Sequence, residues 1–201
     1  MSLVHQARFA AIDFESAGAA RGKTDSPIQI GMATWSLSAG HGEPFCSYLF
    51  TAQPIQWSAR KIHGIGPADL ATAPALVTLW PEVKARLQGA IVVAHGKGTE
   101  KRFLRSFPGH GFGPWLDTLL LARAVWPSLA DHSLGALCRH HGLASTITEI
   151  VPRKSWHDAL FDAVASLVLL AHVIESLQLA QTPLDALLHP DTSIWHQSKR
   201  A

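Results

Sequence analysis

The order of apolar runs along the chain is the strongest constraint on its fold. Three short runs rich in β-branched and aromatic residues come first, at residues 9–14, 28–37 and 45–50, separated by turns containing Gly, Ser and Pro. A mainly helical stretch at residues 58–87, interrupted by prolines, then leads to a continuous apolar run at residues 89–96, which is typical of a buried strand. Because a strand after a helical crossover is usually parallel to its neighbours, this order predicts an α/β fold with a mixed sheet.

The second half of the chain is predicted to be mostly helical. The pattern indicates helices at residues 99–107, 118–126 and 133–141, a short strand at residues 115–117, and one long amphipathic helix at residues 156–179. The apolar stripe of that helix consists of Leu160, Val164, Leu167, Val168, Ala171 and Ile174. This helix is the natural element to pack on the sheet.

Length and composition limit the class of protein. With 201 residues and 47% hydrophobic content, we expect one domain at residues 1–181, followed by a C-terminal tail at residues 182–201. The formal net charge of +2 does not by itself indicate nucleic-acid binding, so that argument depends on local charge.

Cysteine usage and hydropathy indicate the compartment. Cys46 and Cys138 lie far apart and have no metal-binding spacing, which disfavours a disulfide framework and a zinc finger. The N-terminus has no signal-peptide pattern, and the most apolar run, residues 163–174, is too short to span a bilayer. We therefore expect a soluble cytoplasmic protein without membrane contact.

Two acidic residues stand close together at the end of the first apolar run. In an extended strand, Asp13 and Glu15 point to one face, and Phe14 between them points to the other face, into the core. Neighbouring carboxylates favour a cation, and Mg²⁺ and Mn²⁺ prefer such oxygen ligands. A solvated strand end also fits this spacing, so both interpretations stay open.

A second polar group lies at the start of the long helix. Ser155 and Asp158 have the spacing of a capping box, which predicts His157 in the first turn and Asp162 about a turn and a half later. The side chains of His157 and Asp162 are then roughly 140° apart around the axis, so they can share only a site over the N-terminal end of the helix. Exposed polar positions would fit as well, but the apolar neighbours of Asp162 favour a buried acid that needs a partner.

A third acid, Glu100, follows the buried strand through a turn bounded by glycines. It falls in the first turn of the helix predicted at residues 99–107, where the helix dipole favours a carboxylate. This preference is sufficient to explain an acid here, so a role for Glu100 depends on the motifs around it.

The three acidic segments resemble a known family. AIDFE at residues 11–15, VVAH with an acid shortly after it, and H-x-A-x-x-D-A at residues 157–163 resemble the three exonuclease motifs of the DEDDh (DnaQ-like) 3′-to-5′ exonucleases, relatives of polymerase III proofreading subunits, RNase T and oligoribonuclease. KIHGI at residues 61–65 and DTLLLAR at residues 117–123 also resemble intermediate segments of that family. The resemblance implies an RNase H-like fold, whose mixed central sheet has strands 1–3 antiparallel and helices on both faces.

The resemblance also implies an activity. It indicates a metal-dependent 3′-to-5′ exonuclease that uses two divalent ions, Mg²⁺ or Mn²⁺, to release nucleoside monophosphates from the 3′ ends of single-stranded DNA or RNA. Asp13, Glu15 and Asp162 would be metal ligands, Glu100 the fourth acid and His157 the general base. These roles are chemically consistent, because phosphodiester cleavage needs an activated water and a place for developing negative charge.

Nucleic-acid contacts are predicted from local charge, from aromatic rings and from the resemblance, which places His63 near the terminal nucleotide. The predicted residues are Phe14, Ser16, His63, Lys97, Lys101, Arg153 and Lys154. Cationic side chains contact phosphates without sequence preference, and a ring such as Phe14, Trp57 or Trp156 can stack on a base. A basic helix face is more often simply solvated, and a tryptophan more often belongs to the core.

The chain departs from the family pattern in two motifs. Glu100 stands where the family usually has Asp, and its extra methylene could retune or weaken activity. Ser16 and Ala17 stand where two threonines are common, although Gly18 matches. These departures put side-chain contacts to the terminal nucleotide in doubt more than backbone contacts.

Two other functions stay open. An exonuclease-like domain could bind a 3′ end or a partner protein with weak or no catalysis, and the altered second motif is its support. A hydrolase of small phosphoesters would share the acids but should lack a basic groove. The resemblance leaves open both a homodimer and an association with a DNA polymerase.

Overall fold

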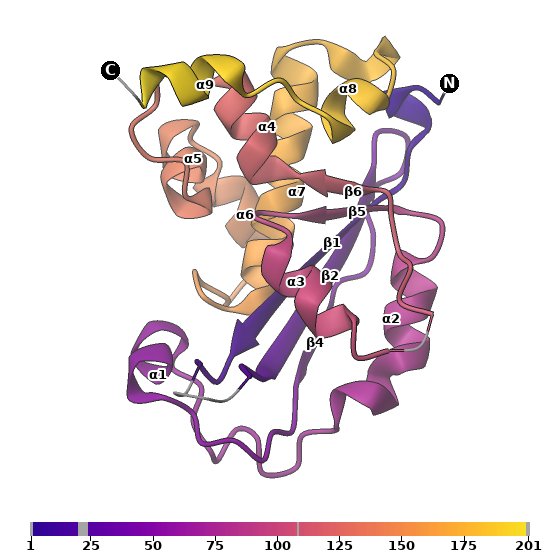
Figure 1. Cartoon of the computed structure of the whole chain (residues 1–201). Coiled ribbons are helices and arrows are strands. Elements are labelled where there is room, and N and C mark those ends of the chain that lie inside the picture. The colour runs from indigo at the N-terminus through magenta and orange to yellow at the C-terminus, as the bar shows by residue number, and fades with distance from the viewer. Residues whose placement is uncertain (1, 20–23, 108, 200–201) are drawn as a thin grey trace.

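The computed structural model describes residues 2–19, 24–107 and 109–199, and its core is a six-stranded sheet (Figure 1). The strands are β1 (Phe9–Ser16), β2 (Pro27–Ser36), β3 (Gly40–His41), β4 (Phe45–Tyr48), β5 (Ile91–Ala94) and β6 (Trp115–Asp117). The strand order is β3-β2-β1-β5-β6, and β4 also pairs with β2. β1, β2 and β4 are antiparallel in succession, whereas β5 and β6 run parallel to β1, which confirms the predicted mixed sheet.

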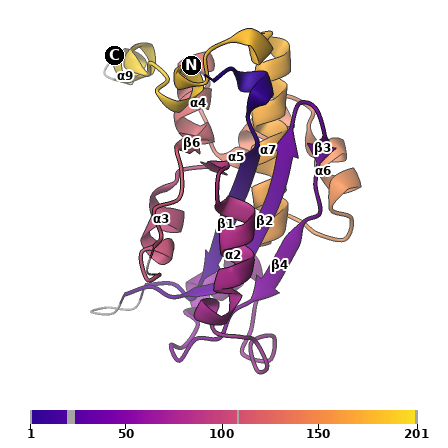
Figure 2. The same ribbon diagram turned by 90° about the vertical axis from the view of Figure 1, so that its right-hand side faces the viewer.

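Helices cover both faces of the sheet, as predicted (Figures 1 and 2). The α-helices are α1 (Trp57–His63), α2 (Trp80–Leu87), α3 (Gly98–Leu104), α4 (Thr118–Val125), α5 (Leu134–His140), α6 (Ala144–Ile150), α7 (Ala159–Ser176), α8 (Asp185–Leu188) and α9 (Ser193–Ser198). Short 3₁₀ turns occupy Val4–Gln6, Leu76–Leu79 and Leu179–Gln181. α7 packs on one face together with α5 and α6, and α2 and α3 cover the other.

Alternation along β1 decides which way each side chain points. Phe9 and Ala11 belong to the cluster that packs against α7, whereas Ile12 and Phe14 belong to the cluster under α2 and α3. By the same alternation, Asp13 and Glu15 lie on the α7 face. The long helix and the two acids are therefore on the same side of the sheet.

Three features of the structure differ from the prediction. Residues 58–87 form two helical parts rather than one stretch, because turns at residues 64–75 separate α1 from the 3₁₀ segment and α2. Helix α6 was not predicted at all. The long helix begins at Ala159 rather than at residue 156, because the Asp158 side chain accepts hydrogen bonds from Leu160 N and Phe161 N and so caps the helix itself.

Helix α7 is also more deeply buried than an amphipathic helix. Its 18 residues are long and apolar enough to cross a membrane by length and composition, unlike the shorter run considered from the sequence. Most of them are buried in the folded domain, including several outside the predicted stripe, such as Ala165 and Leu169. This burial on nearly all sides is that of a central core helix.

The segment after residue 182 packs against the rest of the chain. Val4 N donates to Thr182 O at 3.0 Å, and Leu184 N donates to Ser2 O at 3.0 Å. Leu184 and Leu187 join the core cluster around α7. The division of the chain at residue 181 stays a prediction.

Candidate active site

A glycine in β2 allows α7 to reach the acids of β1. Gly31 is the register partner of Asp13. A Cβ atom at Gly31 would lie 2.2 Å from Ala159 C and from Leu160 N, so the first turn of α7 rests directly on this glycine. Any larger residue would push the start of the helix away from the sheet.

A glutamine two residues earlier fixes the same helix end. Gln29, 1% exposed, accepts a hydrogen bond from Ala159 N at 3.0 Å and donates to Asp158 Oδ2 at 3.0 Å. Asp158 Oδ2 also accepts from Lys154 Nζ at 2.7 Å. Because Gln29 is the register partner of Glu15, this clamp holds the start of α7 beside the second acid of β1. Sequence reasoning missed Gln29, since a single amide in an apolar run carries no motif.

Glu15, Glu100 and Asp162 lie close enough to Asp13 to raise its pKa. Burial, and then the charges of Asp162, Glu100 and Glu15, raise the pKa of Asp13 well above its usual range. Burial, and then the charges of Asp162 and Asp158, raise the pKa of Glu15 to about 8. Side chains from β1, α3 and α7 are thus brought to one place.

Burial is also the main cause at the other two acids. It raises the pKa of Glu100 to about 7 and that of Asp162 to about 7. At Asp162 the backbone N–H of His157, which donates to Oδ2 at 3.3 Å, partly opposes this rise. Partly protonated carboxyl groups at neutral pH are the expected state of an acidic cluster without a cation.

Three of the site residues have the geometry of a metal-binding group. Glu15, His157 and Asp162 each offer one ligand atom, and these atoms lie within 4.8 Å of one another. Among the described residues, Asp13 and Glu100 do not belong to that compact group. Two buried carboxylate oxygens, Glu100 Oε2 and Asp162 Oδ1, have no hydrogen-bond partner within the described part of the chain. Unpartnered anionic oxygens in an acidic cluster fit a divalent cation.

His157 lies outside the helix, and the prediction of a first-turn position and a Ser155–Asp158 capping box was wrong. It precedes the cap residue Asp158 and has a φ of 67°, a left-handed conformation that is uncommon for a residue other than Gly. Its side chain is exposed. The turn directs an accessible imidazole over the N-terminal end of α7, where Asp162 also lies.

Asp117 positions the turn that carries Glu100. Its Oδ1 accepts from Gly96 N at 3.0 Å, and its Oδ2 accepts from Lys97 N at 3.3 Å. Asp117 also caps α4 by accepting from Leu119 N. Glu100, 5% exposed, falls in the first turn of α3 as predicted. The DTLLLAR segment therefore has a structural reason to begin with an acid.

Helix α1 places His63 at the end of β1. Ile65 N donates to His63 Nδ1 at 3.0 Å, so Nε2 carries the proton that is donated to Ser16 O at 3.2 Å. Burial lowers the pKa of His63, and the nearby His157 contributes in the same direction. Gly18, with a φ of 85°, packs closely against α1. His63 is thus neutral and lies beside the acidic cluster.

The other residues predicted to contact nucleic acid differ in how accessible their side chains are. Phe14 is 6% exposed and packs edge-on against Phe103, which leaves little ring surface for a base. Lys154 is engaged by Asp158, whereas Arg153 is exposed. Lys97 and Lys101 are half-buried on α3.

Two tryptophans considered for stacking also differ. Trp57 is 74% exposed on α1, and Trp156 packs edge-on against Phe161 at 4.9 Å between ring centroids.

His95, directly after the buried strand β5, has both ring nitrogens engaged within the protein. Its Nε2 donates to His132 O at 2.9 Å, and its other ring nitrogen contacts Thr118 Oγ1 at 3.0 Å. These contacts give His95 a structural role.

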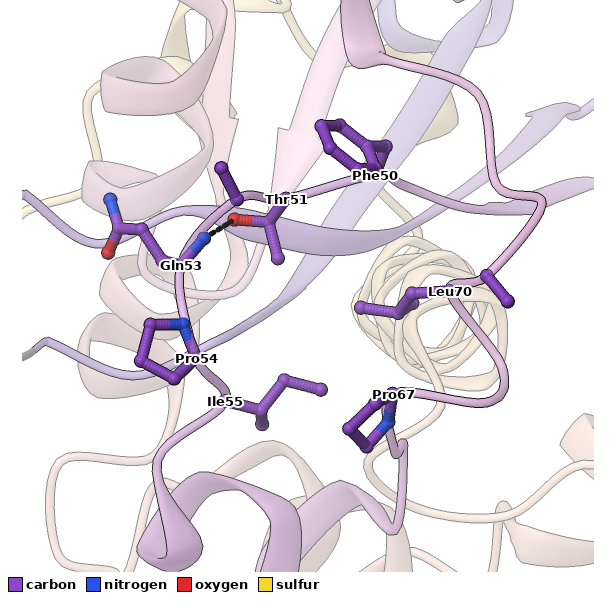
Figure 3. Close-up of a pocket in the computed structure, with 9 residues that line it drawn as sticks. Phe50, Thr51, Gln53, Pro54, Ile55, Pro67 and Leu70 are labelled. Atoms are coloured by element: carbon purple, nitrogen blue, oxygen red, sulfur yellow. Dashed lines mark hydrogen bonds between the residues drawn. The ribbon is translucent and has the colours of Figure 1, made fainter.

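A pocket of about 410 Å³ lies between residues 50–55 and 67–71 (Figure 3). Its wall includes Phe50, Ile55 and Leu70, and Gln53 N donates to Thr51 Oγ1 at 3.1 Å. None of the predicted site residues lines it. It lacks the titratable groups that hydrolysis needs, so the acidic cluster is the better candidate for the chemistry.

The acidic cluster predicts a pH-dependent stability in metal-free protein. Carboxyl groups whose pKa is higher in the folded than in the unfolded state hold protons more tightly when folded, so the free energy of unfolding falls as pH rises from about 4 to about 8. Asp162→Asn removes one of these carboxyls. We therefore expect the melting temperature of Asp162→Asn, relative to the unchanged protein, to increase with pH in calorimetry with EDTA.

The same linkage predicts how Mg²⁺ stabilises the protein. Because a divalent cation binds deprotonated carboxylates, added MgCl₂ should raise the melting temperature more at pH 8 than at pH 5.5, and much less in Asp162→Asn. Equal shifts at both pH values, or an undiminished shift in the variant, would place the ion elsewhere.

Curated relatives match part of the chain. A DNA polymerase III subunit epsilon-like protein from Rhodobacter capsulatus is 34% identical over 129 residues, which are 62% of this chain and 18% of that protein. A PolC-type DNA polymerase III from Halalkalibacterium halodurans is 30% identical over 142 residues, 68% of this chain and 9% of that protein. The chain thus spans less than a fifth of the length of these two relatives.

Solved structures share the fold. A structure described as exonuclease X in complex with 5′ overhanging duplex DNA has a TM-score of 0.69 and 24% identity, and the match covers 86% of this chain and 97% of that one. The nuclease domain of 3′hExo, described as a DEDDh family member bound to rAMP, has a TM-score of 0.66 and 13% identity, over 87% and 94% of the two chains. These likenesses confirm the RNase H-like fold. A family model described as RNase T, Exonuclease, matches residues 10–170, and the chain therefore belongs to this exonuclease family.

Proposed function

We propose that the chain is a metal-dependent 3′-to-5′ exonuclease that releases nucleoside monophosphates from the 3′ ends of single-stranded DNA or RNA. The observation that carries the proposal is the convergence of Asp13, Glu15, Glu100 and Asp162, whose buried and mutually repelling carboxyls have raised pKa values. Such a cluster is costly to the fold unless a cation neutralises it. Membership of the exonuclease family supports this reading.

The proposed metal ligands are Asp13, Glu15 and Asp162, with Glu100 as the fourth acid. Asp13 is held within β1 opposite Gly31, Asp162 by the docking of α7 on that glycine, and Glu100 by the turn that Asp117 holds. Two divalent ions, Mg²⁺ or Mn²⁺, would supply charge stabilisation at the phosphoryl group and at the leaving oxygen. The cage of hard oxygen donors suits these ions.

His157 is the proposed general base. Its imidazole is exposed, so it can take the proton from a water molecule that attacks the terminal phosphodiester. The backbone of the same residue is tied to Asp162 by a hydrogen bond, which keeps the base close to the acids. Breaking the bond between phosphorus and the 3′ oxygen of the penultimate nucleotide then releases a nucleoside 5′-monophosphate.

The proposed site for the terminal nucleotide lies beside Ser16 and His63. Neutral His63 holds the backbone carbonyl of Ser16 and fixes the chain that follows Glu15. Gly18 keeps the next turn close to α1. Backbone groups of this segment are therefore held in place, which offsets the absence of the family's two threonines. Arg153, exposed just before His157, is a proposed phosphate contact.

The test uses single-stranded DNA and RNA, each labelled at either end, with Mg²⁺ or Mn²⁺. We expect a ladder of products shortened from the 3′ end, absent with EDTA and in Asp13→Ala. Tight binding of the 3′ end without cleavage would favour the alternative of an exonuclease-like binding domain with weak or no catalysis, here called the binding-module alternative. Preferential hydrolysis of a nucleotide monophosphate ester would favour a small-phosphoester hydrolase.

The longer acid at position 100 gives a more specific prediction. Because Glu100 is buried and its charge reaches Asp13, shortening it by one methylene should withdraw the carboxylate from the cluster. We expect Glu100→Asp to lower kcat by about tenfold to a hundredfold at an unchanged melting temperature. A rise in kcat would show that the extra methylene holds the native site away from its best geometry.

A partner is proposed from the relatives' descriptions alone. The two curated relatives given above are described as a DNA polymerase III subunit epsilon-like protein and a PolC-type DNA polymerase III. Association with a DNA polymerase is therefore a candidate setting for the same activity. Co-purification with a polymerase subunit, compared with size measurements on the isolated chain, would separate this setting from a homodimer. The expected cytoplasmic location also stays a prediction.

A further inference from the structure

Helix α3 carries a row of cations next to Glu100. Lys97 is the N-cap of α3, Lys101 lies within the helix and Arg105 is its C-cap. Lys101 N donates to Lys97 O and Arg105 N donates to Lys101 O, each at 3.2 Å, so the three side chains lie on one side of the helix. We call these three residues the α3 stripe. The stripe extends about 12 Å along the helix. Lys101 follows Glu100 directly, so the two side chains point about 100° apart around the helix axis. Figure 1 shows α3 beginning beside the end of β5.

Within the described part of the chain, the cations of the α3 stripe have no acidic partner. Among the described residues, no carboxylate oxygen lies within 4.0 Å of any of the three. By contrast, Arg102 on the same helix lies 3.5 Å from Asp25, and Lys154 near His157 lies 2.7 Å from Asp158. All three cations of the stripe are therefore free to contact an anionic ligand.

The three cations follow one another along one side of α3. Lys97 and Lys101 are half-buried, and Arg105 is exposed. Like charges in such a row repel one another, and an anion placed between them relieves that repulsion.

A pocket of about 250 Å³ opens beside the stripe. Lys101, Arg105 and His110 supply polar groups to its wall, and Phe112 and Trp115 supply rings. Lys101 Nζ lies 5.4 Å from the Trp115 ring centroid, and Trp115 Nε1 donates to Phe112 O at 2.9 Å, which fixes the indole. Cations above an aromatic wall are the features that bind phosphate and base together.

We propose that the α3 stripe and this pocket form a subsite for the single strand upstream of the nucleotide being removed. Phosphates of that strand contact Lys97, Lys101 and Arg105, and one base lies against Trp115. The inference rests on the proposed exonuclease function. These contacts depend on neither base sequence nor sugar. Only a strand long enough to reach the subsite gains them, so the enzyme prefers longer strands to the shortest ones.

The test compares a strand of about 12 nucleotides with a dinucleotide. In the triple variant Lys97→Gln, Lys101→Gln and Arg105→Gln, we expect KM for the long strand to rise about tenfold or more, and KM for the dinucleotide to stay unchanged. Loss of three phosphate contacts should also reduce the slope of log KM against log salt concentration by about 2. The matched control, Arg102→Gln, removes a cation from the same helix but outside the stripe.

A binding measurement separates the two proposals. Anisotropy of a labelled strand with Asp13→Ala needs no cleavage, so it reports the subsite even if hydrolysis is absent. We expect Asp13→Ala to bind the strand tightly. Loss of this binding when the three substitutions of the stripe are combined with Asp13→Ala in one protein supports the subsite, whether or not the unchanged protein cleaves. A triple variant that binds and degrades the long strand as the unchanged protein does, with a native circular dichroism spectrum, overturns the inference.

Discussion

Asp162→Asn should lower metal-dependent hydrolysis by at least about a thousandfold and should leave the protein at least as stable as before. The substitution keeps the shape of the side chain and removes one charge from a cluster whose carboxyl pKa values are raised by burial. It also removes Asp162 Oδ1 as a buried anionic oxygen without a partner. Loss of activity with no loss of stability is the combination expected of a metal ligand.

The measurement pairs single-turnover kinetics on a labelled strand with thermal unfolding followed by circular dichroism. Asp185→Asn on α8 is the control, because that carboxylate is exposed and distant from the motifs. It should change neither quantity by more than a small fraction. A destabilised Asp162→Asn would mean that the acid supports the fold, and the proposed ligand set would have to be revised.

The sheet and the two acids of β1 could be predicted because their signals are local. Apolar runs and turns fix the strands, and the two-residue period fixes the common face of Asp13 and Glu15. The structure confirms the mixed sheet with antiparallel β1, β2 and β4, and the position of Glu100 in the first turn of α3. These features depend on neighbours in sequence, so a single sequence contains them.

The residues that join the segments could not be predicted in the same way. Gln29, Gly31 and Asp117 each act on an element that is distant in sequence, and nothing in their own surroundings indicates the contact. The start of α7 was misplaced for a similar reason. Asp158 is held by Gln29 and Lys154, so the cap is chosen by tertiary contacts rather than by the spacing to Ser155.

The cost of the acidic cluster distinguishes the proposed enzyme from the binding-module alternative. A domain that only held a nucleic-acid end would gain from cations near the phosphates and would lose from four converging carboxyls. This site instead keeps its acids together, and the three cations of the α3 stripe lie along one side of α3. An acidic cluster that is separate from the α3 stripe suits a site that binds metal and nucleic acid at the same time.

Gly31→Ala should be strongly destabilising and inactive, in contrast to Asp162→Asn. The added Cβ would lie 2.2 Å from backbone atoms of Ala159 and Leu160, which cannot move without lifting the start of α7 from β2. We expect a loss of at least about 3 kcal/mol in the free energy of unfolding, or about 6–12 °C in melting temperature. Hydrolysis should fall with it, because Asp162 moves away from Asp13.

The control is Gly98→Ala at the start of α3, where an added Cβ meets no heavy atom within 4 Å. Alanine is favoured in a helix, so this variant should be as stable as the unchanged protein. Unfolding in urea, followed by circular dichroism, would measure both. If Gly31→Ala were as stable as Gly98→Ala, then α7 could dock on the sheet without this close contact. The joining of His157 and Asp162 to the acids of β1 would then need another structural cause.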